Sequence, residues 1–315
     1  MLKSALDTAG SIAVVSHKDP DGDCLGSLLG LGHILLANGK RTKLYLDGEI
    51  PFNFRFLPDI STIYNKPDED IHDLIIVLDC SDIARIGSMV EVFNHSKSSV
   101  CIDHHLSNDG FCDLNIIESD YSSTGEMVYE ISKHLGYSVN QEAATNIYAA
   151  MLTDTGKFIY SNTSSQTMRN VAELIDKGIN FSKIAENIYG NEDRDVYLVK
   201  ARIMSEVEFY LEGRLSVAPI TKRILDEYGV SLKDVDGIVE SIRDIQGVQV
   251  SCVLKEISSR NTKVSLRSKG DVDVSKISMF YNGGGHERAA GFNLESDINE
   301  SKKIVVEHLG KHMVR

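Results

Sequence analysis

The stretch that decides the fold reads Ser11-Ile12-Ala13-Val14-Val15-Ser16-His17-Lys18-Asp19-Pro20-Asp21-Gly22-Asp23. It begins with a short apolar run, which is typical of a buried strand, and ends in a polar turn rich in carboxylates. The same arrangement returns twice, because Asp79 follows the apolar run 74–78 and Asp103-His104-His105 follows the run 100–102. Ligands of an open parallel sheet bind beyond the carboxyl ends of its strands. These side chains are therefore expected to meet at one edge of one sheet.

Strands and helices alternate through the first half of the chain. Alternation of this kind argues for an α/β fold in which a doubly wound, mostly parallel sheet has helices on both faces. A further acidic residue, Asp154, is expected at the end of a helix and not of a strand. The expected strands are 11–16, 42–46, 74–78 and 99–102, and the expected helices are 24–38, 123–135 and 141–152.

The second half of the chain changes character, and a length of 315 residues exceeds what one ordinary core holds. Residues 164–211 are helical and charged, whereas strand-like runs begin again after Gly213 and a terminal helix is expected over 301–311. We predict a catalytic domain over 1–190, a linker helix over 191–213 and a smaller α/β substrate-binding domain over 214–315, with a cleft between the two domains.

The charge balance bears on the size of the substrate. The formal net charge is −13 and the chain has no Trp. A protein that grips long duplexes usually presents a basic face, and a processive single-strand exonuclease needs a basic track with stacking aromatic side chains. A small substrate that carries phosphate fits this composition better than a polymer does.

Cysteine usage and hydropathy bear on location. The five cysteines are scattered and form no CxxC pair, so no disulfide framework is expected. The apolar runs are of strand length, well short of the roughly 20 residues that a membrane span needs. Asp7 stands where a signal peptide would keep an apolar segment. We expect a cytoplasmic protein without a membrane partner.

The spacing of the acidic and imidazole residues is typical of a centre with two metal ions. Gly22 lets the chain turn tightly, so that His17 and Asp21 can face one ion while Asp23 faces its neighbour. Asp79 is placed to bridge the ions, and His104 and Asp154 to complete the second. Two ions roughly 3.5–4 Å apart stabilise both the attacking and the leaving oxygen of an in-line phosphoryl displacement.

The ligand types also indicate the metal. Mixed imidazole and carboxylate ligands favour Mn²⁺ or a similar transition metal over Mg²⁺. Beside the ligands, His105 is placed to donate to a phosphoryl oxygen, and Asp103 to orient a neighbouring imidazole. A single Asp-Gly-Asp turn or His-His pair is more often a surface feature. The whole ordered set is hard to explain in that way.

A second signal lies near the C-terminus, where Asn282 is followed by three glycines and then by His286, Glu287 and Arg288. Consecutive glycines expose backbone N–H groups and allow an anion to approach closely. Upstream, Arg267-Ser268-Lys269 ends a basic stretch, and Arg is suited to bidentate phosphate contacts. A glycine triplet alone is more often a flexible loop, but beside this basic stretch it favours a clamp for a phosphate or a nucleotide.

Together these residues resemble the DHH phosphoesterase superfamily, which is named for the triad that stands here as Asp103-His104-His105. Its other motifs match the stretch 17–23, Asp79 and Asp154, and the glycine motif resembles the DHH-associated C-terminal domain. The resemblance spans nearly the whole chain. Within the superfamily, the short two-domain layout and the runs 152–163 and 267–274 are similar to nanoRNases that also act as pAp phosphatases. One departure is Tyr281-Asn282 ahead of the glycines, where other residues are commoner.

The resemblance implies two Mn²⁺ ions, a homodimer and a set of residue roles. One ion would be held by His17, Asp21 and Asp79. The other would be held by Asp23, Asp79, His104 and Asp154. His105 would lie near the scissile phosphate, with Asp103 beside it. The candidate substrate contacts are Arg267, Ser268, Gly284, Gly285, His286 and Arg288.

The expected function is hydrolysis of very short oligonucleotides and linear dinucleotides, such as pGpG and pApA, to mononucleotides by a hydroxide that two metal ions activate. Conversion of pAp to AMP is expected as a second activity. A cyclic-dinucleotide phosphodiesterase and a manganese pyrophosphatase are the alternatives, although the basic C-terminal signature of the latter is not found. A non-enzymatic nucleotide-binding regulator would lack a metal ligand, whereas every ligand position is filled here.

Overall fold

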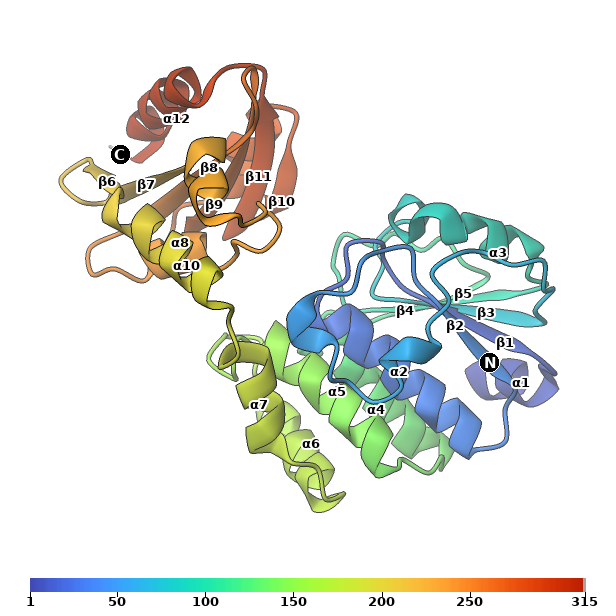
Figure 1. Ribbon diagram of the computed structural model, residues 1–315. Coiled ribbons are helices and arrows are strands. Elements are labelled where there is room, and N and C mark those ends of the chain that lie inside the picture. The colour runs from blue at the N-terminus through green and yellow to red at the C-terminus, as the bar shows by residue number, and fades with distance from the viewer. Residues whose placement is uncertain (314–315) are drawn as a thin grey trace. The chain divides into compact units, whose positions relative to one another are not determined.

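The computed structural model describes residues 1–313, except for the side chain of His286. The chain divides into two compact units, Met1–Asn191 and a second that starts at Glu192 (Figure 1). Within the described residues, no helix is long and apolar enough to cross a membrane.

The first unit is built on a parallel sheet in the order β2-β1-β3-β4-β5. The α/β fold expected from the sequence is therefore confirmed. The three middle strands are buried along their whole length, because helices cover both faces of the sheet. The strands are β1 (Ile12–Val15), β2 (Thr42–Tyr45), β3 (Leu74–Leu78), β4 (Ser99–Asp103) and β5 (Leu114–Ile117).

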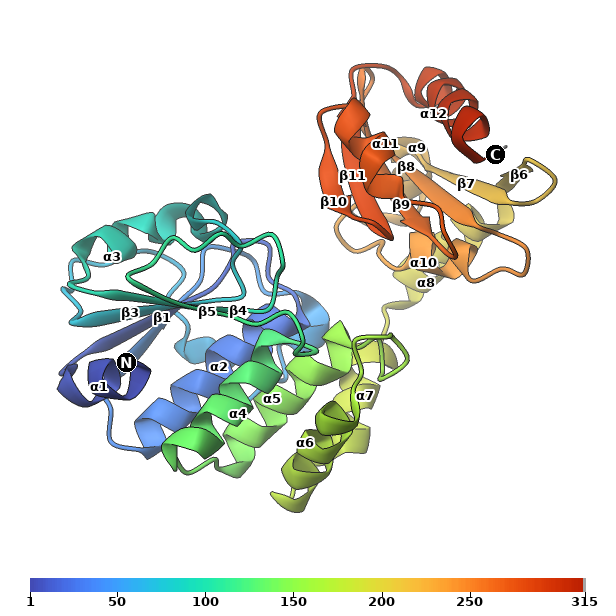
Figure 2. The ribbon, with the colours of Figure 1, turned by 180° about the vertical axis from the view of Figure 1, so that it is seen from behind.

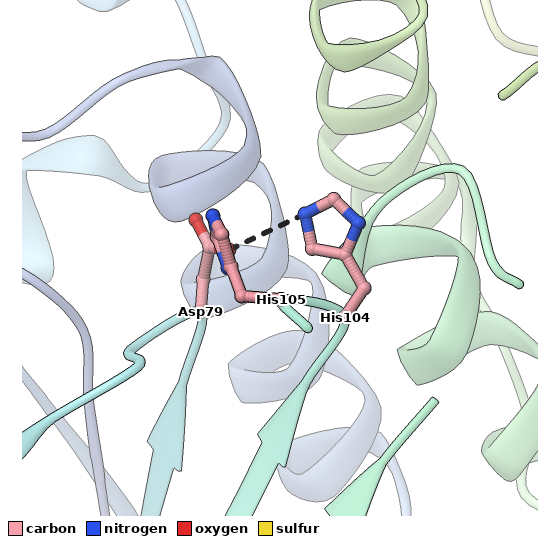
Figure 3. A group of neighbouring side chains, drawn as sticks. All are labelled: Asp79, His104 and His105. Atoms are coloured by element: carbon pink, nitrogen blue, oxygen red, sulfur yellow. Dashed lines mark ion pairs between the residues drawn. The ribbon is translucent and has the colours of Figure 1, made fainter. Parts of the chain in front are cut away.

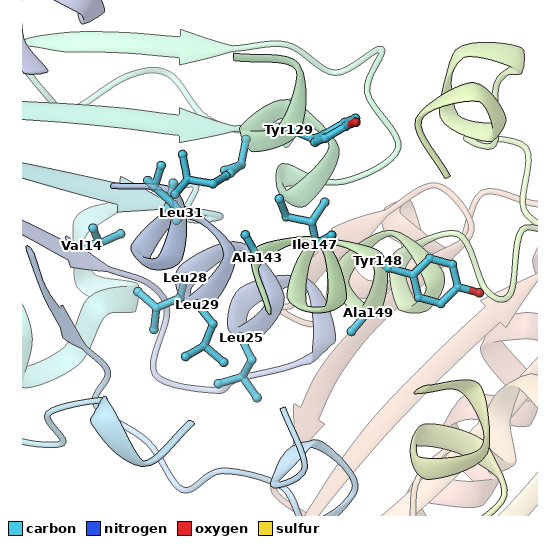
Figure 4. Close-up of a cluster of buried hydrophobic side chains, with 14 of the residues drawn as sticks. Val14, Leu25, Leu28, Leu29, Leu31, Tyr129, Ala143, Ile147, Tyr148 and Ala149 are labelled. Atoms are coloured by element: carbon cyan, nitrogen blue, oxygen red, sulfur yellow. The ribbon is translucent and has the colours of Figure 1, made fainter. Parts of the chain in front are cut away.

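Helices α2, α4 and α5 lie along one face of this sheet and α3 lies along the other (Figures 1 and 2). The larger apolar cluster fills the α2 side, where side chains of α2 and α5 meet (Figure 4). A smaller cluster on the other face joins Val15 and Val77 to Ile86 and Val92. The helices are α1 (Leu2–Thr8), α2 (Gly22–Ala37), α3 (Val90–His95), α4 (Thr124–Leu135), α5 (Gln141–Asp154), α6 (Ser165–Asp176) and α7 (Phe181–Tyr189), and the 3₁₀ segments are η1 (Phe52–Phe54), η2 (Ile60–Thr62) and η3 (Ile83–Met89).

Glycines allow α2 and α5 to pack unusually closely. A Cβ at Gly26 would lie 2.4 Å from the carbonyl oxygen of Asn146, and one at Gly30 would lie 2.7 Å from the side chain of Ile147. Both distances are shorter than a normal contact, so only a glycine fits at this spacing. Because α2 begins beside Asp21 and α5 ends at Asp154, this contact sets the distance between acidic residues that lie far apart in the sequence.

The second unit contains a mixed sheet in the order β10-β11-β9-β8-β7-β6, in which β7 and β8 are parallel and the other pairs antiparallel. Apolar clusters occupy both faces of this sheet, one under α12 and the other under α8 to α10. The strands are β6 (Glu208–Tyr210), β7 (Leu215–Ile220), β8 (Val250–Ser258), β9 (Asn261–Ser268), β10 (Gly284–His286) and β11 (Ala289–Leu294), and the helices are α8 (Arg194–Ser205), α9 (Lys222–Tyr228), α10 (Ile238–Arg243), α11 (Val274–Phe280) and α12 (Ile298–Met313).

The segment 191–213 differs from the continuous linker helix that the sequence predicts. It contains α8, whose buried residues Val199 and Ile203 pack into the second unit's core, and then β6, which pairs with β7. The segment therefore belongs structurally to the second unit. Its polar sequence fits this arrangement, because α8 buries only one face.

Candidate functional site

The carboxyl ends of β1 and β3 bring the first group of acidic and imidazole side chains together. Asp79 follows β3 directly with a φ of 56°, a left-handed conformation that is uncommon for a residue with a side chain. Its Oδ2 lies 3.3 Å from Nε2 of His17, which lies 3.8 Å from Oδ1 of Asp21. One ligand atom from each of these three residues lies within 4.8 Å of the others.

A second group lies on the other side of Asp79. Nε2 of His104 lies 3.8 Å from Oδ2 of Asp23, 3.5 Å from Oδ2 of Asp154 and 3.8 Å from Oδ1 of Asp79. Asp23 comes from the first turn of α2 and Asp154 from the last residue of α5. Each oxygen of Asp79 thus faces a different group, so this carboxylate joins the two.

The carboxylate of Asp103 orients His105, whose ring lies beside Asp79 and His104 (Figure 3). Its Nδ1 lies 2.7 Å from Oδ1 of Asp103 and 3.5 Å from Oδ1 of Asp79. The other oxygen of Asp103 accepts a hydrogen bond of 2.7 Å from Asn108, which also donates to the carbonyl of Cys80. Burial alone would lower the pKa of His105, but the hydrogen bond to Asp103 and the charge of Asp79 raise it to about 9.

The N-terminus of α4 holds two of the carboxylates in place. The backbone N–H groups of Thr124 and Gly125 donate to Asp23 at 2.8 and 2.9 Å, and Ser27 Oγ donates to the same carboxylate at 2.9 Å. Thr124 Oγ1 donates to Asp79 at 3.2 Å. A helix N-terminus favours negative charge because its first N–H groups have no partner within the helix.

The sequence does not predict these supporting residues. The start of α4 is visible in the sequence as the pattern Ser123-x-x-Glu126, which is typical of a helix N-terminus. Nothing in that pattern indicates which carboxylates the helix contacts. For Asn108 the sequence carries no signal beyond its position five residues after Asp103.

The pKa values show how much negative charge gathers here. Burial raises the pKa of Asp23 well above its ordinary range, and the charges of Asp79 and Asp154 raise it further. Burial also raises the pKa of Asp154, to about 6, and that of Asp21. Burial alone would raise the pKa of Asp79 too, but its hydrogen bond with His17 and the nearby imidazoles lower it to about 2. Carboxylates crowded in this way fit the binding of cations.

The donor set fits divalent metal ions. Imidazole nitrogens suit transition metals, and carboxylate oxygens suit Mg²⁺, Ca²⁺ and Mn²⁺. The ring of His17 presents Nε2 to the acidic residues, and its buried Nδ1 has no hydrogen-bond partner among the described residues. The residues at the ends of β1, β3, β4 and α5 therefore form a candidate centre for more than one metal ion.

A separate acidic group near β2 does not offer the same chemistry. Asp68, Asp70 and His72 also bring ligand atoms within 4.8 Å of one another. Lys43 Nζ lies between the two carboxylates, at 2.8 Å from Asp68 and 2.7 Å from Asp70. An ammonium group already provides the positive charge there.

The structure brings Arg267, Ser268 and Arg288 together at one end of the β9–β11 pair in the second unit. Arg267 pairs across the strands with Ala289, next to Arg288, and its Nε lies 2.9 Å from Oε1 of Glu240 on α10. Ser268 Oγ and Arg288 Nη1 both donate to the carbonyl of Val272, at 2.6 and 3.0 Å. Ser268 and Arg288 thus contact the same carbonyl group in the loop between β9 and α11, whereas Arg267 is directed toward α10.

The glycine run forms part of a strand pair and not an open loop. A Cβ at Gly283 would lie 2.2 Å from the carbonyl oxygen of Gly291, and one at Gly285 would lie 2.5 Å from that of Ala289. Gly285 also has a φ of 136°. A Cβ at Gly284 would meet nothing within 4 Å, so this position is open to an approaching ligand. The side chain of His286 lies outside the described part of the structure.

A parallel sheet whose strand ends gather imidazoles and paired carboxylates, followed by a unit with two arginines at one end of a strand pair, defines the class of metal-dependent phosphoesterases. The model of the DHH family N-terminal domain matches residues 11–153, and that of the DHHA1 domain matches residues 215–311. The chain belongs to the DHH family of phosphoesterases, as its motifs predict.

Relatives of known name match almost the whole chain. A bifunctional oligoribonuclease and PAP phosphatase NrnA of Thermus thermophilus is 31% identical over 310 residues, which cover 97% of this chain and 91% of the relative. The protein of the same name from Bacillus subtilis is 29% identical over 300 residues, which cover 94% and 93%. The crystal structure of an exopolyphosphatase-related protein from Bacteroides fragilis superposes with a TM-score of 0.93 at 29% identity, covering 98% of this chain and 94% of that one.

Proposed function

We propose that this chain is a Mn²⁺-dependent phosphodiesterase that cleaves very short oligonucleotides and linear dinucleotides, such as pGpG and pApA, to mononucleotides. As a second activity it converts pAp to AMP. The observation that carries the proposal is the position of Asp79, whose two oxygens face two separate groups of metal-ligand side chains. The near full-length similarity to relatives named for oligoribonuclease and PAP phosphatase activity supports the substrate class.

Two ions would be held by side chains that already lie close together. His17, Asp21 and Asp79 would bind one ion, and Asp23, Asp79, His104 and Asp154 the other. When bound, such ions neutralise charge on the reacting phosphate and make water acidic enough to act as the nucleophile at neutral pH. We favour Mn²⁺ because each group combines imidazole with carboxylate.

His105 is the side chain that we expect to act on the substrate directly. Asp103 holds its Nδ1. Against the effect of burial, this contact and the charge of Asp79 raise the pKa of the ring to about 9, and the raised pKa favours the protonated form. The imidazolium would donate its Nε2–H to a phosphoryl oxygen of the substrate, where negative charge grows during displacement. Asp103 and Asn108 fix the ring for this task.

The second unit would bind the end of the substrate that does not react. Arg267, Ser268 and Arg288 lie at one end of the β9–β11 pair, and Gly284 on the neighbouring strand β10 leaves its backbone open. We propose that these residues, with Gly285 and His286, hold a terminal phosphate or base and so limit substrate length. The homodimer is an expectation from the family resemblance, and the cytoplasmic location is an expectation from the sequence.

A panel of substrates tests the proposed function. Purified protein with Mn²⁺ would be assayed on pGpG, pApA, a 5-mer, a 20-mer, cyclic di-AMP, pAp and pyrophosphate. Fast release of mononucleotides from the dinucleotides, with little from the 20-mer, is the expected result. Activity confined to pyrophosphate or to the cyclic dinucleotide would refute the proposed substrate class but not the proposed metal centre.

A pair of variants on one hairpin tests the substrate-binding unit. Arg267→Gln should raise the KM for pApA about tenfold or more with a smaller change in kcat, because a charged contact to phosphate is lost. Arg260, in the turn between β8 and β9, provides the matched control, and Arg260→Gln should leave KM unchanged. His286→Ala should also act mainly on KM. A loss of kcat with intact binding would place Arg267 or His286 in the chemistry instead.

A further inference from the structure

Glu126 is a buried carboxylate in the first turn of α4 that none of the expected motifs includes. Glu126 is only 1% exposed to solvent. One oxygen accepts hydrogen bonds from Ser122 N and Oγ at 2.9 and 2.7 Å and from Thr167 Oγ1 at 3.1 Å. The other accepts from Asn170 Nδ2 at 3.0 Å. All of these donors are neutral, so the carboxylate is satisfied by hydrogen bonds and not by a salt bridge to any of them.

These contacts join the first turns of two helices. Ser122 immediately precedes Ser123, the residue that caps α4, whereas Thr167 lies in the first turn of α6 and takes part in its capping box. Asn170 lies further along α6, and the oxygen of its side-chain amide accepts a hydrogen bond of 2.9 Å from Lys133 of α4. Glu126 therefore fixes where α4 begins relative to α6.

The start of α4 is the part of the helix that holds the metal ligands. Thr124 and Gly125, which stand directly before Glu126, donate their backbone N–H groups to Asp23. Thr124 Oγ1 donates to Asp79. A shift of this turn by a few tenths of an ångström would move these donors away from both carboxylates.

A second connection leads from the same segment to Asp154. The carbonyl oxygen of Ser122 accepts a hydrogen bond of 3.0 Å from Asn162, and the same amide donates to the carbonyl oxygen of Asp154 at 3.1 Å. Glu126 thus reaches, through Ser122 and Asn162, the backbone of a third acidic residue in the centre.

We infer that Glu126 is a positioning residue for the metal centre, which sets the carboxylates of Asp23, Asp79 and Asp154 before any ion binds. The inference rests on the proposed two-metal centre and adds to it a residue that touches neither metal nor substrate. Substitution of a residue that supports a metal ligand commonly lowers metal affinity or activity by about 10–100-fold.

The chemistry of the contacts requires a carboxylate and not merely a side chain of this size. A carboxylate accepts on both oxygens, whereas Gln has one oxygen and an NH₂ group that only donates. In Glu126→Gln, the NH₂ group would face the donors of Ser122 or Asn170, and a buried pair of donors is unfavourable. The double variant Glu126→Gln/Asn170→Asp restores a donor opposite an acceptor and keeps the total charge.

Metal binding in the absence of nucleotide tests the inference. Mn²⁺ would be titrated calorimetrically into metal-free full-length protein, and hydrogen exchange of the amides in 121–130 would be followed in the same metal-free samples. Glu126→Gln should weaken Mn²⁺ binding by roughly 10–100-fold and speed exchange at Thr124 and Gly125. The double variant should recover most of the affinity. At saturating Mn²⁺, the KM for pApA should be unchanged.

Glu130 offers a matched control one turn further along α4. Its side chain is 25% exposed and also connects α4 with α6, through Gln166 at 3.2 Å, while Lys133 of its own helix lies 2.9 Å away. Glu130→Gln should bind Mn²⁺ as the wild type does. The inference would be overturned if Glu126→Gln bound Mn²⁺ as tightly as the wild type, or if Glu126→Gln and Glu130→Gln lost equal affinity. It would also be overturned if the double variant bound Mn²⁺ no better than Glu126→Gln. If Glu126→Gln fails to fold, the double variant decides. Since no nucleotide enters the titration, failure of the proposed substrate class would be seen separately, in the turnover panel.

Discussion

The contact between α2 and α5 yields a quantitative prediction, because it fixes the distance between acidic residues on different helices. In Gly26→Ala the new Cβ would lie 2.4 Å from the carbonyl oxygen of Asn146 and 2.8 Å from the Cβ of Ala150. Most of the obstruction is backbone, which cannot rotate away, so the helices must separate. Asp23 at the start of α2 and Asp154 at the end of α5 would then move apart.

The expected change in the free energy of unfolding of Gly26→Ala follows from two opposing effects. Overpacking a tight interior typically costs about 1–3 kcal/mol, and a clash with backbone belongs near the upper limit. Replacing Gly by Ala in a helix returns about 1 kcal/mol. We therefore expect a net loss of about 2 kcal/mol, which lowers the unfolding temperature of a unit of this size by about 4–8 °C.

Gly32 on the same helix provides the control. The atoms nearest to its Cβ would all belong to the side chain of Leu44, with the two methyl groups at 2.8 Å, and a side-chain end can adjust. Scanning calorimetry of the full-length, metal-free variants should show Gly26→Ala melting well below Gly32→Ala, which should stay within about 2 °C of the wild type. Mn²⁺ affinity should fall in Gly26→Ala alone. If Gly26→Ala were as stable as Gly32→Ala, the close helix contact would not hold the centre together.

Three further predictions concern the centre itself. Asp79→Ala should lose both ions and all turnover, because each of its oxygens faces a different ligand group, and mass spectrometry that found two bound ions would refute that role. His105→Gln should keep both ions while kcat falls by about 10²–10⁴-fold, as expected for a proton donor, and loss of metal would make His105 a ligand instead. Mn²⁺ affinity should fall as the pH falls through 6, because the metal must displace the proton from a carboxyl group, Asp154, whose pKa is raised to about 6. Protonation of Asp154 alone should make the Mn²⁺ affinity at pH 5 roughly tenfold lower than at neutral pH. Calorimetry that detected no proton release on Mn²⁺ binding at pH 6 would contradict this prediction.

The sequence predicts the first unit well because its strands are buried on both faces. Continuous apolar runs such as 74–78 end abruptly in charged residues, so both the strand and the position of Asp79 at its end can be predicted. Strand β5 was missed because it is short and half-buried, with Asn115 interrupting its apolar run. In the second unit, the glycines of β10 have no side chains that could show a strand period, so the sequence predicts a clamp for an anion there and not the strand.

The supporting residues of the centre could not be predicted, for a different reason. Gly125 holds Asp23 with a backbone N–H group across 102 residues of sequence, and a backbone donor leaves no trace in the residue type. The role inferred for Glu126 depends likewise on where α6 lies. Ligand-type residues can be predicted from their chemistry, whereas the groups that hold them depend on the packing of the helices.

The most direct test of the account is to locate manganese in crystals of the protein grown with Mn²⁺, by anomalous scattering at the manganese absorption edge. We expect one peak on each side of Asp79. One should lie beside His17 and Asp21, and the other beside Asp23, His104 and Asp154. A single peak, or peaks elsewhere with none at Asp79, would contradict the central claim that this carboxylate joins two metal ions.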